Sequence, residues 1–302
     1  MNENLSMSFE LRELSEVGGV EVRGLDVGAI LDADTVAALE SAFDKYAVLL
    51  FRDQPLSAQQ LADFGRCFGP VQPHVQRAYQ HPQVPEVVMM TSVKSDGSFD
   101  DAGARRGAIE KTRDGWHSDL SYDPVPAKAT LLHSLELPSR GGNTCFCNAA
   151  IAYASLDDSF KAQLDGLTAQ FVYGGNARNK STAIAATALD EEGQASAHAI
   201  HPVISRHAKT GMPGIYVNPL MTTRILGVSQ ATSEEILERL FDALDDQRVR
   251  FEHQWQVGDT VIWDNRGGLL HTGRLDYPRS EARRFIRTTV TGAAIAPYRG
   301  VT

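Results

Sequence analysis

The amino-acid sequence predicts a mostly β protein with flanking helices, arranged as a jelly roll (a double-stranded β-helix, also called cupin-like). Many short apolar segments alternate with turn residues along the 302 residues, a pattern typical of sandwiches and barrels. A few amphipathic helices lie between these segments. Because no internal repeat, low-complexity tract or linker divides the chain, we expect one domain over residues 1–302.

Four helices are expected from apolar residues that recur every three to four positions, over residues 33–46, 57–69, 149–165 and 232–247. Ser57 has a side chain of the type that caps a helix N-terminus. Thr232 or Ser233 is expected to cap the last helix, which is the most clearly amphipathic of the four.

Strands are expected where short apolar runs lie between turn residues. Short strands and turns are expected within residues 8–30, followed by strands at 46–51, 84–90, 129–137, 143–148, 201–206, 214–218, 251–256, 259–264 and 283–291. Two polar insertions interrupt this pattern, near residues 94–115 and 175–200. The first ends just before the histidine motif described below, so we interpret it as a mobile loop that closes over a site.

Charge and cysteine content exclude several classes of function. The formal net charge is −9, which argues against nucleic acid as the main partner because phosphate binding requires a basic surface. No apolar run is long enough to span a membrane, and the N-terminus lacks the pattern of a secretory signal. Three cysteines without such a signal favour a reducing cytoplasm. We therefore expect a cytoplasmic protein without nucleic-acid or membrane partners.

A candidate metal site is formed by the segment Trp116-His117-Ser118-Asp119 and the distant His271. On a strand, alternate side chains point to the same face, so His117 and Asp119 could converge on one ion. Two histidines and one carboxylate are the donor set of non-haem Fe(II) oxygenases, which keep open positions for other ligands. By itself, the H-x-D spacing also fits a histidine paired with a carboxylate in an ordinary network.

A second candidate feature is the strand that contains Arg283, Phe285 and Arg287 on one face and Arg284 on the other. If the first face lines the interior, its guanidinium groups require anions, because burial of unpaired charge is costly. An arginine binds a carboxylate through two parallel hydrogen bonds, so a dicarboxylate would meet this need. An edge strand with solvated arginines is the alternative.

Several ordered motifs together resemble the taurine dioxygenase-like (TauD/TfdA) family of Fe(II)/2-oxoglutarate-dependent dioxygenases. The resemblance spans about residues 10–292 and includes YAVLLFRDQPLSAQQLADFGRCFGP, WHSDLSYDPVPAKATLL, LPSRGGNTCFCNAAIAYASL and WQVGDTVIWDNR. It implies the double-stranded β-helix dioxygenase fold, Fe(II) and O₂ as cofactors, and 2-oxoglutarate as cosubstrate. It also implies a homo-oligomer, either a dimer or a tetramer.

The resemblance also implies roles for individual residues. His117, Asp119 and His271 match the iron ligands. The residues matched to cosubstrate binding are Thr144 and Arg283, which bind the distal carboxylate of 2-oxoglutarate, and Arg287, which lies near the proximal carboxylate or the substrate. The residues matched to substrate binding are His74, Arg287 and Trp116, of which Trp116 could shield the iron.

The Arg283-Arg284 doublet leaves the register of the cosubstrate arginine open by one residue. Arg283 is favoured because it shares a strand face with Arg287, and Arg284 is the alternative. The longer, more charged loop at residues 94–115 distinguishes the chain from taurine enzymes. Trp255, Trp263 and Tyr122 are interpreted as packing residues.

These residues imply hydroxylation of a small organic substrate, with 2-oxoglutarate converted to succinate and CO₂. An anionic substrate such as a sulfonate, sulfate ester or carboxylate is expected, because Arg287 and His74 would favour negative charge. Two alternatives remain. The same cofactors could support desaturation or another oxidative outcome on a natural product or amino acid, whereas Asp119 argues against halogenation. A non-enzymatic, cupin-like metal-binding protein is the alternative of another class.

Overall fold

The computed structural model describes residues 9–73, 77–105, 108–109, 112–173 and 198–300. Two β-sheets form the centre of the structure. The larger has eight strands in the order β1-β2-β3-β15-β7-β17-β5-β4, and a smaller one has the order β14-β8-β16-β6. Most neighbouring strands are antiparallel, so the arrangement is a jelly roll and the predicted fold class is confirmed.

The strands of the larger sheet are β1 (Glu10–Glu13), β2 (Val20–Arg23), β3 (Val48–Phe51), β4 (Gln80–His81), β5 (Val84–Thr91), β7 (Ala127–Glu136), β15 (Thr260–Asp264) and β17 (Arg284–Thr291). The smaller sheet consists of β6 (Ala108–Ile109), β8 (Thr144–Asn148), β14 (Arg250–His253) and β16 (Leu269–Arg274). The remaining strands are β9 (Thr168–Val172), β10 (His198–Pro202), β11 (Ile204–Arg206), β12 (Pro213–Ile215) and β13 (Thr222–Ile225).

A buried cluster lies between the two facing sheets. It takes side chains from both, including Leu50 and Trp263 of the larger sheet and Phe146 of the smaller one. Leu49 and Ile262 point from the same strands into a separate cluster on the outer face. Strands β3 and β15 are therefore buried on both faces, which explains their continuous apolar sequences.

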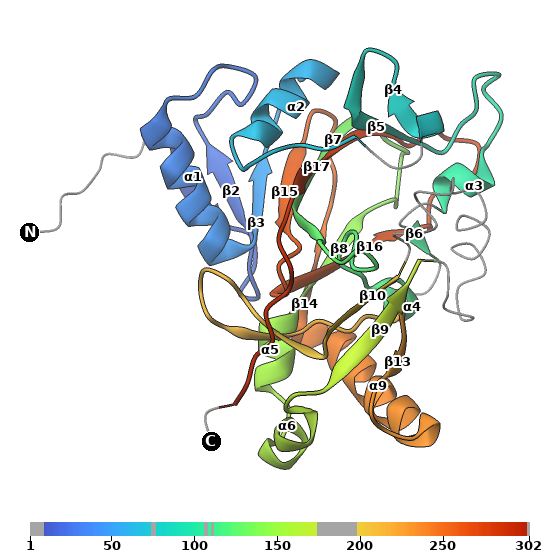
Figure 1. Ribbon diagram of the computed structural model, residues 1–302. Coiled ribbons are helices and arrows are strands. Elements are labelled where there is room, and N and C mark those ends of the chain that lie inside the picture. The colour runs from blue at the N-terminus through green and yellow to red at the C-terminus, as the bar shows by residue number, and fades with distance from the viewer. Residues whose placement is uncertain (1–8, 74–76, 106–107, 110–111, 174–197, 301–302) are drawn as a thin grey trace, which may run out of the picture.

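Helices cover the outer faces of both sheets. Helices α1 (Ala33–Tyr46) and α2 (Ala58–Arg66) lie together beside β2 and β3, whereas α5 (Ala149–Ala154), α6 (Asp158–Leu164) and α9 (Gln230–Leu244) gather at the opposite end (Figure 1). Ser57 caps α2, as predicted, and its capping box with Gln60 is complete. Among the residues that the structure describes, no helix is both long and apolar enough to cross a membrane.

Three predicted helices have different limits in the structure. The helix expected over residues 57–69 ends at Arg66. The helix expected over residues 149–165 is two helices, α5 and α6, because the Asp157 side chain accepts the Phe160 N–H and starts a new helix. The last helix, α9, begins at Gln230 and is capped by Ser229 rather than by Thr232 or Ser233. Ser233 does not cap the helix, because its hydroxyl accepts a hydrogen bond from the Ile225 N–H.

The insertion at residues 94–115 contains regular structure that the sequence did not predict. Within it lie α3 (Asp101–Ala104), the short strand β6 and α4 (Thr112–Gly115). Strand β6 pairs with β16 in parallel, and Arg113 of α4 forms ion pairs with Glu238 and Asp242 of α9. The segment that precedes His117 is thus attached to the sheet and to α9, and its closure over a site remains a prediction. Most of the insertion at residues 175–200 lies outside the described residues.

Candidate active site

His117 and His271 are placed side by side by a backbone bridge. The N–H of each residue donates to the carbonyl of the other, over 3.0 and 2.9 Å, and His271 lies on β16. The prediction that His117 and Asp119 share a strand was wrong, because His117 forms only this isolated bridge and Asp119 lies in a turn. The next residue, Leu120, has a φ of 57°, so the chain turns sharply here.

The structure nevertheless brings the three predicted ligand side chains together. One ligand atom each from His117, Asp119 and His271 lie within 4.8 Å of one another, and all three residues are buried. The His271 Nε2 atom lies 3.0 Å from Asp119 Oδ2, and the His117 Nε2 atom lies 4.0 Å from Asp119 Oδ1. Two imidazoles and one carboxylate, buried in this way, are the donor set expected for a non-haem Fe(II) site.

The His117 ring is held in one tautomer. Its Nδ1 atom lies 2.7 Å from the Gly115 carbonyl oxygen, which can only accept a hydrogen bond. Nδ1 therefore carries the proton, and the lone pair of Nε2 faces Asp119 and is available to a metal ion. Burial, together with the neighbouring His271, lowers the pKa of His117 to about 3, so the ring is neutral at physiological pH.

The Asp119 carboxylate is fixed by donors from two strands. Thr130 of β7 donates to Oδ2 at 2.6 Å, and the Trp263 indole of β15 donates to the same atom at 3.2 Å. Asn265 joins these groups, because its side chain accepts the Asp119 N–H at 3.0 Å and donates to Thr130 at 3.1 Å. The carboxylate therefore has little freedom to rotate.

Arg287 compensates the negative charge of Asp119. Its Nη2 atom lies 3.0 Å from Asp119 Oδ1, and its Nε atom is buried without a hydrogen-bond partner in the part of the chain that the structure describes. Burial alone would raise the pKa of Asp119, but Arg287 and His271 hold that pKa well below its usual range. The carboxylate is thus ionised, and the guanidinium has an unused donor.

The two residues of the arginine doublet lie in different environments. Arg283 precedes β17, donates from Nε to the Gly142 carbonyl at 2.9 Å and packs its guanidinium over the Phe285 ring at 4.1 Å. Within the described ranges it forms no ion pair with a carboxylate, and burial lowers its pKa to about 10. Arg284 begins β17 and is exposed, with an ion pair to Glu136 at 2.7 Å.

Thr144 begins β8, two residues after Gly142, whose carbonyl accepts a hydrogen bond from Arg283. Its buried hydroxyl accepts a hydrogen bond from the Trp255 indole N–H at 3.1 Å. Trp255 in turn packs edge-on against Phe285, with ring centroids 4.8 Å apart. Thr144 and Arg283 thus each contact one ring of the Trp255–Phe285 pair.

The structure does not place the other two predicted site residues, His74 and Trp116, at the metal site. His74 lies outside the described residues. Trp116 is fully buried, and its indole N–H donates to Asp245 at the end of α9 over 3.0 Å. Trp116 therefore packs in the core that includes α9, and its contact with substrate remains a prediction.

Four residues around the site were not predicted as functional: Thr130, Asn265, Trp255 and Trp263, the last of which donates to Asp119 although it was interpreted as packing. Asn265 follows β15 within the WDNR segment, and a buried amide directly after a strand end was a signal that could have been used. Thr130 lies within an apolar strand, and Trp255 was interpreted as packing. Nothing in their local sequence separates them from core residues.

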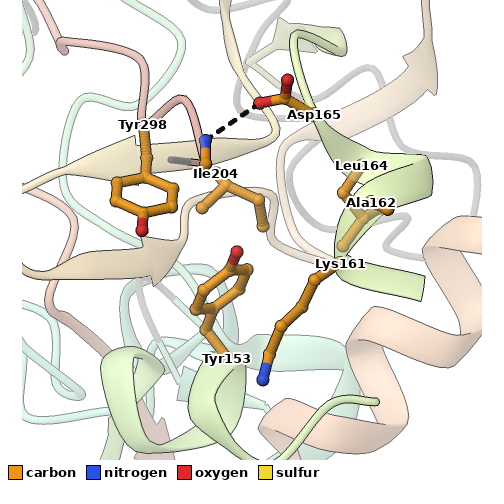
Figure 2. A pocket seen from close by; sticks show the side chains of 8 residues that line it. Tyr153, Lys161, Ala162, Leu164, Asp165, Ile204 and Tyr298 are labelled. Atoms are coloured by element: carbon orange, nitrogen blue, oxygen red, sulfur yellow. Dashed lines mark hydrogen bonds between the residues drawn. The ribbon is translucent and has the colours of Figure 1, made fainter. Parts of the chain in front are cut away.

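A separate cavity of about 390 Å³ lies among α5, α6, β11 and the C-terminal segment, away from these residues. Figure 2 shows Tyr153, Tyr298 and Lys161 among the side chains that line it. The two tyrosine rings pack edge-on, with centroids 5.9 Å apart. The residues that line this cavity include none of the predicted ligands, so it is distinct from the candidate metal site.

Comparisons with known proteins agree with this geometry. Residues 10–289 match the model of the family described as "Taurine catabolism dioxygenase TauD, TfdA family". One relative is the alpha-ketoglutarate-dependent 2,4-dichlorophenoxyacetate dioxygenase of Burkholderia sp. (strain RASC), which is 31% identical over 95% of this chain and 95% of its own length. Another is pentalenolactone F synthase of Streptomyces avermitilis, 30% identical over 92% of this chain and 91% of its own.

One solved structure with a similar fold contains a metal ion and N-oxalylglycine. The crystal structure of AAD-2 in complex with Mn(II) and N-oxalylglycine superimposes with a TM-score of 0.77 at 27% identity, over 94% of this chain and 98% of that chain. Its metal and N-oxalylglycine stand in for iron and 2-oxoglutarate. The buried donor set and the uncompensated Arg283 of this chain fit both groups. The chain belongs to the TauD/TfdA family of Fe(II)/2-oxoglutarate-dependent dioxygenases.

Proposed function

We propose that this enzyme oxidises a small organic anion, with Fe(II) held by His117, Asp119 and His271. The observation that carries the proposal is the convergence of these three buried side chains within 4.8 Å. The iron supplies, when bound, open positions at which a 2-oxo acid and O₂ react to yield an oxidant for a substrate C–H bond. All other steps depend on how the protein holds the reactants.

The cosubstrate is oriented by charge. Arg283 is half-buried and lacks a carboxylate partner among the described residues, and the loss of solvation lowers its pKa, so a charged guanidinium is costly there. The distal carboxylate of 2-oxoglutarate removes this cost by pairing with Arg283 and with the Thr144 hydroxyl. Because Arg284 is exposed and paired with Glu136, we assign this role to Arg283 and not to its neighbour.

The substrate's anionic group is proposed to bind near Arg287. In the structure Arg287 pairs with Asp119, 3.0 Å away. A metal ion bound to Asp119 would neutralise part of the negative charge of that carboxylate. A second anion would then stabilise the Arg287 guanidinium. The unpartnered Nε atom supplies a donor for it. His74 is proposed to contact the same group, on the sequence resemblance alone.

Hydroxylation of a sulfonate, sulfate ester or carboxylate is the reaction that we favour. The name of the Burkholderia relative specifies an aryloxyacetate, which is a carboxylate, and this supports an anionic substrate. The name of the Streptomyces relative specifies a natural-product synthase, so desaturation or another oxidation of a natural product is the second candidate. A purely metal-binding role is inconsistent with the enzymatic relatives.

A substrate panel tests the proposal. The Fe(II)-loaded enzyme would be given 2-oxoglutarate, O₂ and one candidate each from sulfonates, sulfate esters, aryloxy acids and amino acids, while succinate release is measured. At least one anion should accelerate succinate release and be oxidised in equal amount. Acceleration only by neutral or cationic compounds would reject the anionic substrate and leave the iron site intact.

A further inference from the structure

We propose that Trp255 is a positioning residue for the cosubstrate, which acts by orienting the Thr144 hydroxyl. The inference rests on the proposed role of Thr144 in binding the distal carboxylate of 2-oxoglutarate. It starts from the hydrogen bond that the Trp255 indole donates to Thr144 Oγ1 over 3.1 Å.

The chemistry of the two groups gives this hydrogen bond one direction. An indole N–H can only donate, whereas a hydroxyl has one hydrogen to donate and two lone pairs that accept. Trp255 therefore occupies a lone pair of Thr144 and leaves the hydroxyl hydrogen to another acceptor. In the ranges that the structure describes, the Thr144 hydroxyl has no other hydrogen-bond partner. A carboxylate beside Arg283 would be that acceptor.

The Trp255 ring is held firmly enough to orient its neighbour. The His253 ring meets it edge-on at 4.6 Å on one side, and the Phe285 ring meets it edge-on at 4.8 Å on another. His253 lies directly opposite Thr144 in the pairing of β14 with β8, so the chain brings Trp255 back to Thr144 two residues later. The position of the indole is therefore set by the sheet itself.

His253 is anchored from behind by a buried carboxylate. Its Nε2 atom lies 3.2 Å from Asp259 Oδ2, and the same oxygen accepts the Gln256 N–H at 2.8 Å and pairs with Arg52 at 2.5 Å. The Asp259 side chain is fully buried. This network fixes His253 and the backbone after Trp255, and so restricts the direction in which the indole N–H points.

Arg283 contacts the other ring of the same aromatic pair. Its guanidinium carbon lies 4.1 Å from the centroid of Phe285, the ring against which Trp255 packs. Arg283 supplies charge, and Thr144, oriented by Trp255, supplies a directed neutral donor. These two hydrogen-bond donors, Arg283 and Thr144, are both held by the aromatic pair and would set the orientation of the cosubstrate as well as its affinity.

The test is the affinity for 2-oxoglutarate of the Trp255→Phe variant, which keeps an aromatic ring but lacks the N–H. Binding would be measured calorimetrically on Mn(II)-loaded protein, so that it does not depend on turnover. Loss of one neutral hydrogen bond should weaken binding by about threefold to tenfold. The KM for 2-oxoglutarate should rise by a similar factor, and by more than the KM of the primary substrate.

A double-mutant cycle with Thr144→Val distinguishes an indirect from a direct role. If Trp255 acts through Thr144, Trp255→Phe should weaken binding no further once the hydroxyl is absent. Additive losses would overturn the inference, because they would mean that Trp255 contacts the cosubstrate itself. Tyr298→Phe, in the separate cavity, is the matched control and should bind 2-oxoglutarate as the unchanged protein does.

Two further arms keep the outcomes separable. If Arg283→Gln and Thr144→Val weaken binding but Trp255→Phe does not, this inference fails and the proposed cosubstrate site stands. If neither Arg283→Gln nor Thr144→Val weakens binding, the proposed site itself fails. Trp255→Tyr, which also lacks the indole N–H, replaces Trp255→Phe if the latter does not fold.

Discussion

Arg287 forms an ion pair with the buried Asp119 at the centre of the candidate active site, with Nη2 3.0 Å from Oδ1. The pair joins a proposed metal ligand to a proposed substrate-binding residue. The same carboxylate also accepts hydrogen bonds from Thr130 and Trp263, so its position does not depend on Arg287 alone. Substitution of Arg287 is therefore expected to weaken substrate binding more than metal binding.

Arg287→Gln should raise the KM of the primary substrate, by about tenfold or more, because a charge-assisted contact to its anionic group is lost. The KM for 2-oxoglutarate and the amount of bound metal should change much less. Steady-state kinetics with each substrate varied in turn measure both constants. His74→Ala should show the same pattern. Variants that change only the KM for 2-oxoglutarate would place Arg287 at the cosubstrate instead.

Arg283→Gln should raise the KM for 2-oxoglutarate by at least about tenfold, because the distal carboxylate loses its charged partner. Arg284→Gln is the matched control, since this side chain is 45% exposed and pairs with Glu136 at the surface. It should leave the KM for 2-oxoglutarate within about twofold of the unchanged enzyme. The opposite result, with the larger effect at Arg284, would shift the register by one residue.

Asn265→Ala should lower metal affinity by about tenfold to a hundredfold, although Asn265 is not a ligand. Its side chain joins the Asp119 backbone, Thr130 and Ser118, so its loss frees the carboxylate to rotate. Calorimetric titration with Mn(II) measures the effect. The free energy of unfolding of the variant, measured in urea, should also be lower by about 1–3 kcal/mol, because buried polar groups lose their partners. Unchanged metal affinity with lowered stability would assign Asn265 to the fold alone.

The buried His133 should make the protein less stable as the pH falls. Burial lowers its pKa to about 4, from about 6.5 in an unfolded chain. Below pH 6.5 His133 is protonated in the unfolded chain but stays neutral in the folded protein. The contribution of neutral His133 to the free energy of unfolding is therefore complete above pH 6.5 and is lost as the pH falls toward 4. At pH 5 the loss from this residue should be about 1–2 kcal/mol.

Urea unfolding at pH 7.5 and pH 5 measures this dependence. In His133→Gln the difference between the two pH values should shrink by about the same 1–2 kcal/mol, whatever the variant's stability at pH 7.5. The hydrogen bond of the His133 Nδ1 atom to Thr260, at 2.9 Å, is replaceable by the glutamine amide. An unchanged difference would show that His133 is protonated in the folded protein.

The sequence predicted the fold class and the family because these depend on local patterns and on ordered motifs. The helix at 33–46 appears with the same limits as α1, since its apolar spacing is clear and Asp32 caps it. The helix at 149–165 was wrong because Asp157 starts a new helix within a sequence of otherwise helical spacing. One short-range hydrogen bond decided that outcome.

The three candidate metal ligands were also found from sequence, but for a partly wrong reason. The convergence of His117 and Asp119 was explained by a strand, whereas the structure places them by a bridge to His271 and a turn. Such long-range pairing is absent from any local pattern. The same holds for Trp255, whose contact with Thr144 depends on the register of β14 with β8.

The most direct test of the central claim is the rate of 2-oxoglutarate-dependent succinate release by the Fe(II)-loaded Asp119→Ala variant. The matched control is Asp158→Ala, at a side chain that is fully exposed on α6. We expect the control to release succinate at the unchanged rate and Asp119→Ala to fall by more than about a hundredfold, since even residues behind a ligand matter by 10- to 100-fold. Normal succinate release by Asp119→Ala, with iron bound in equal amount, would contradict the assignment of the iron site.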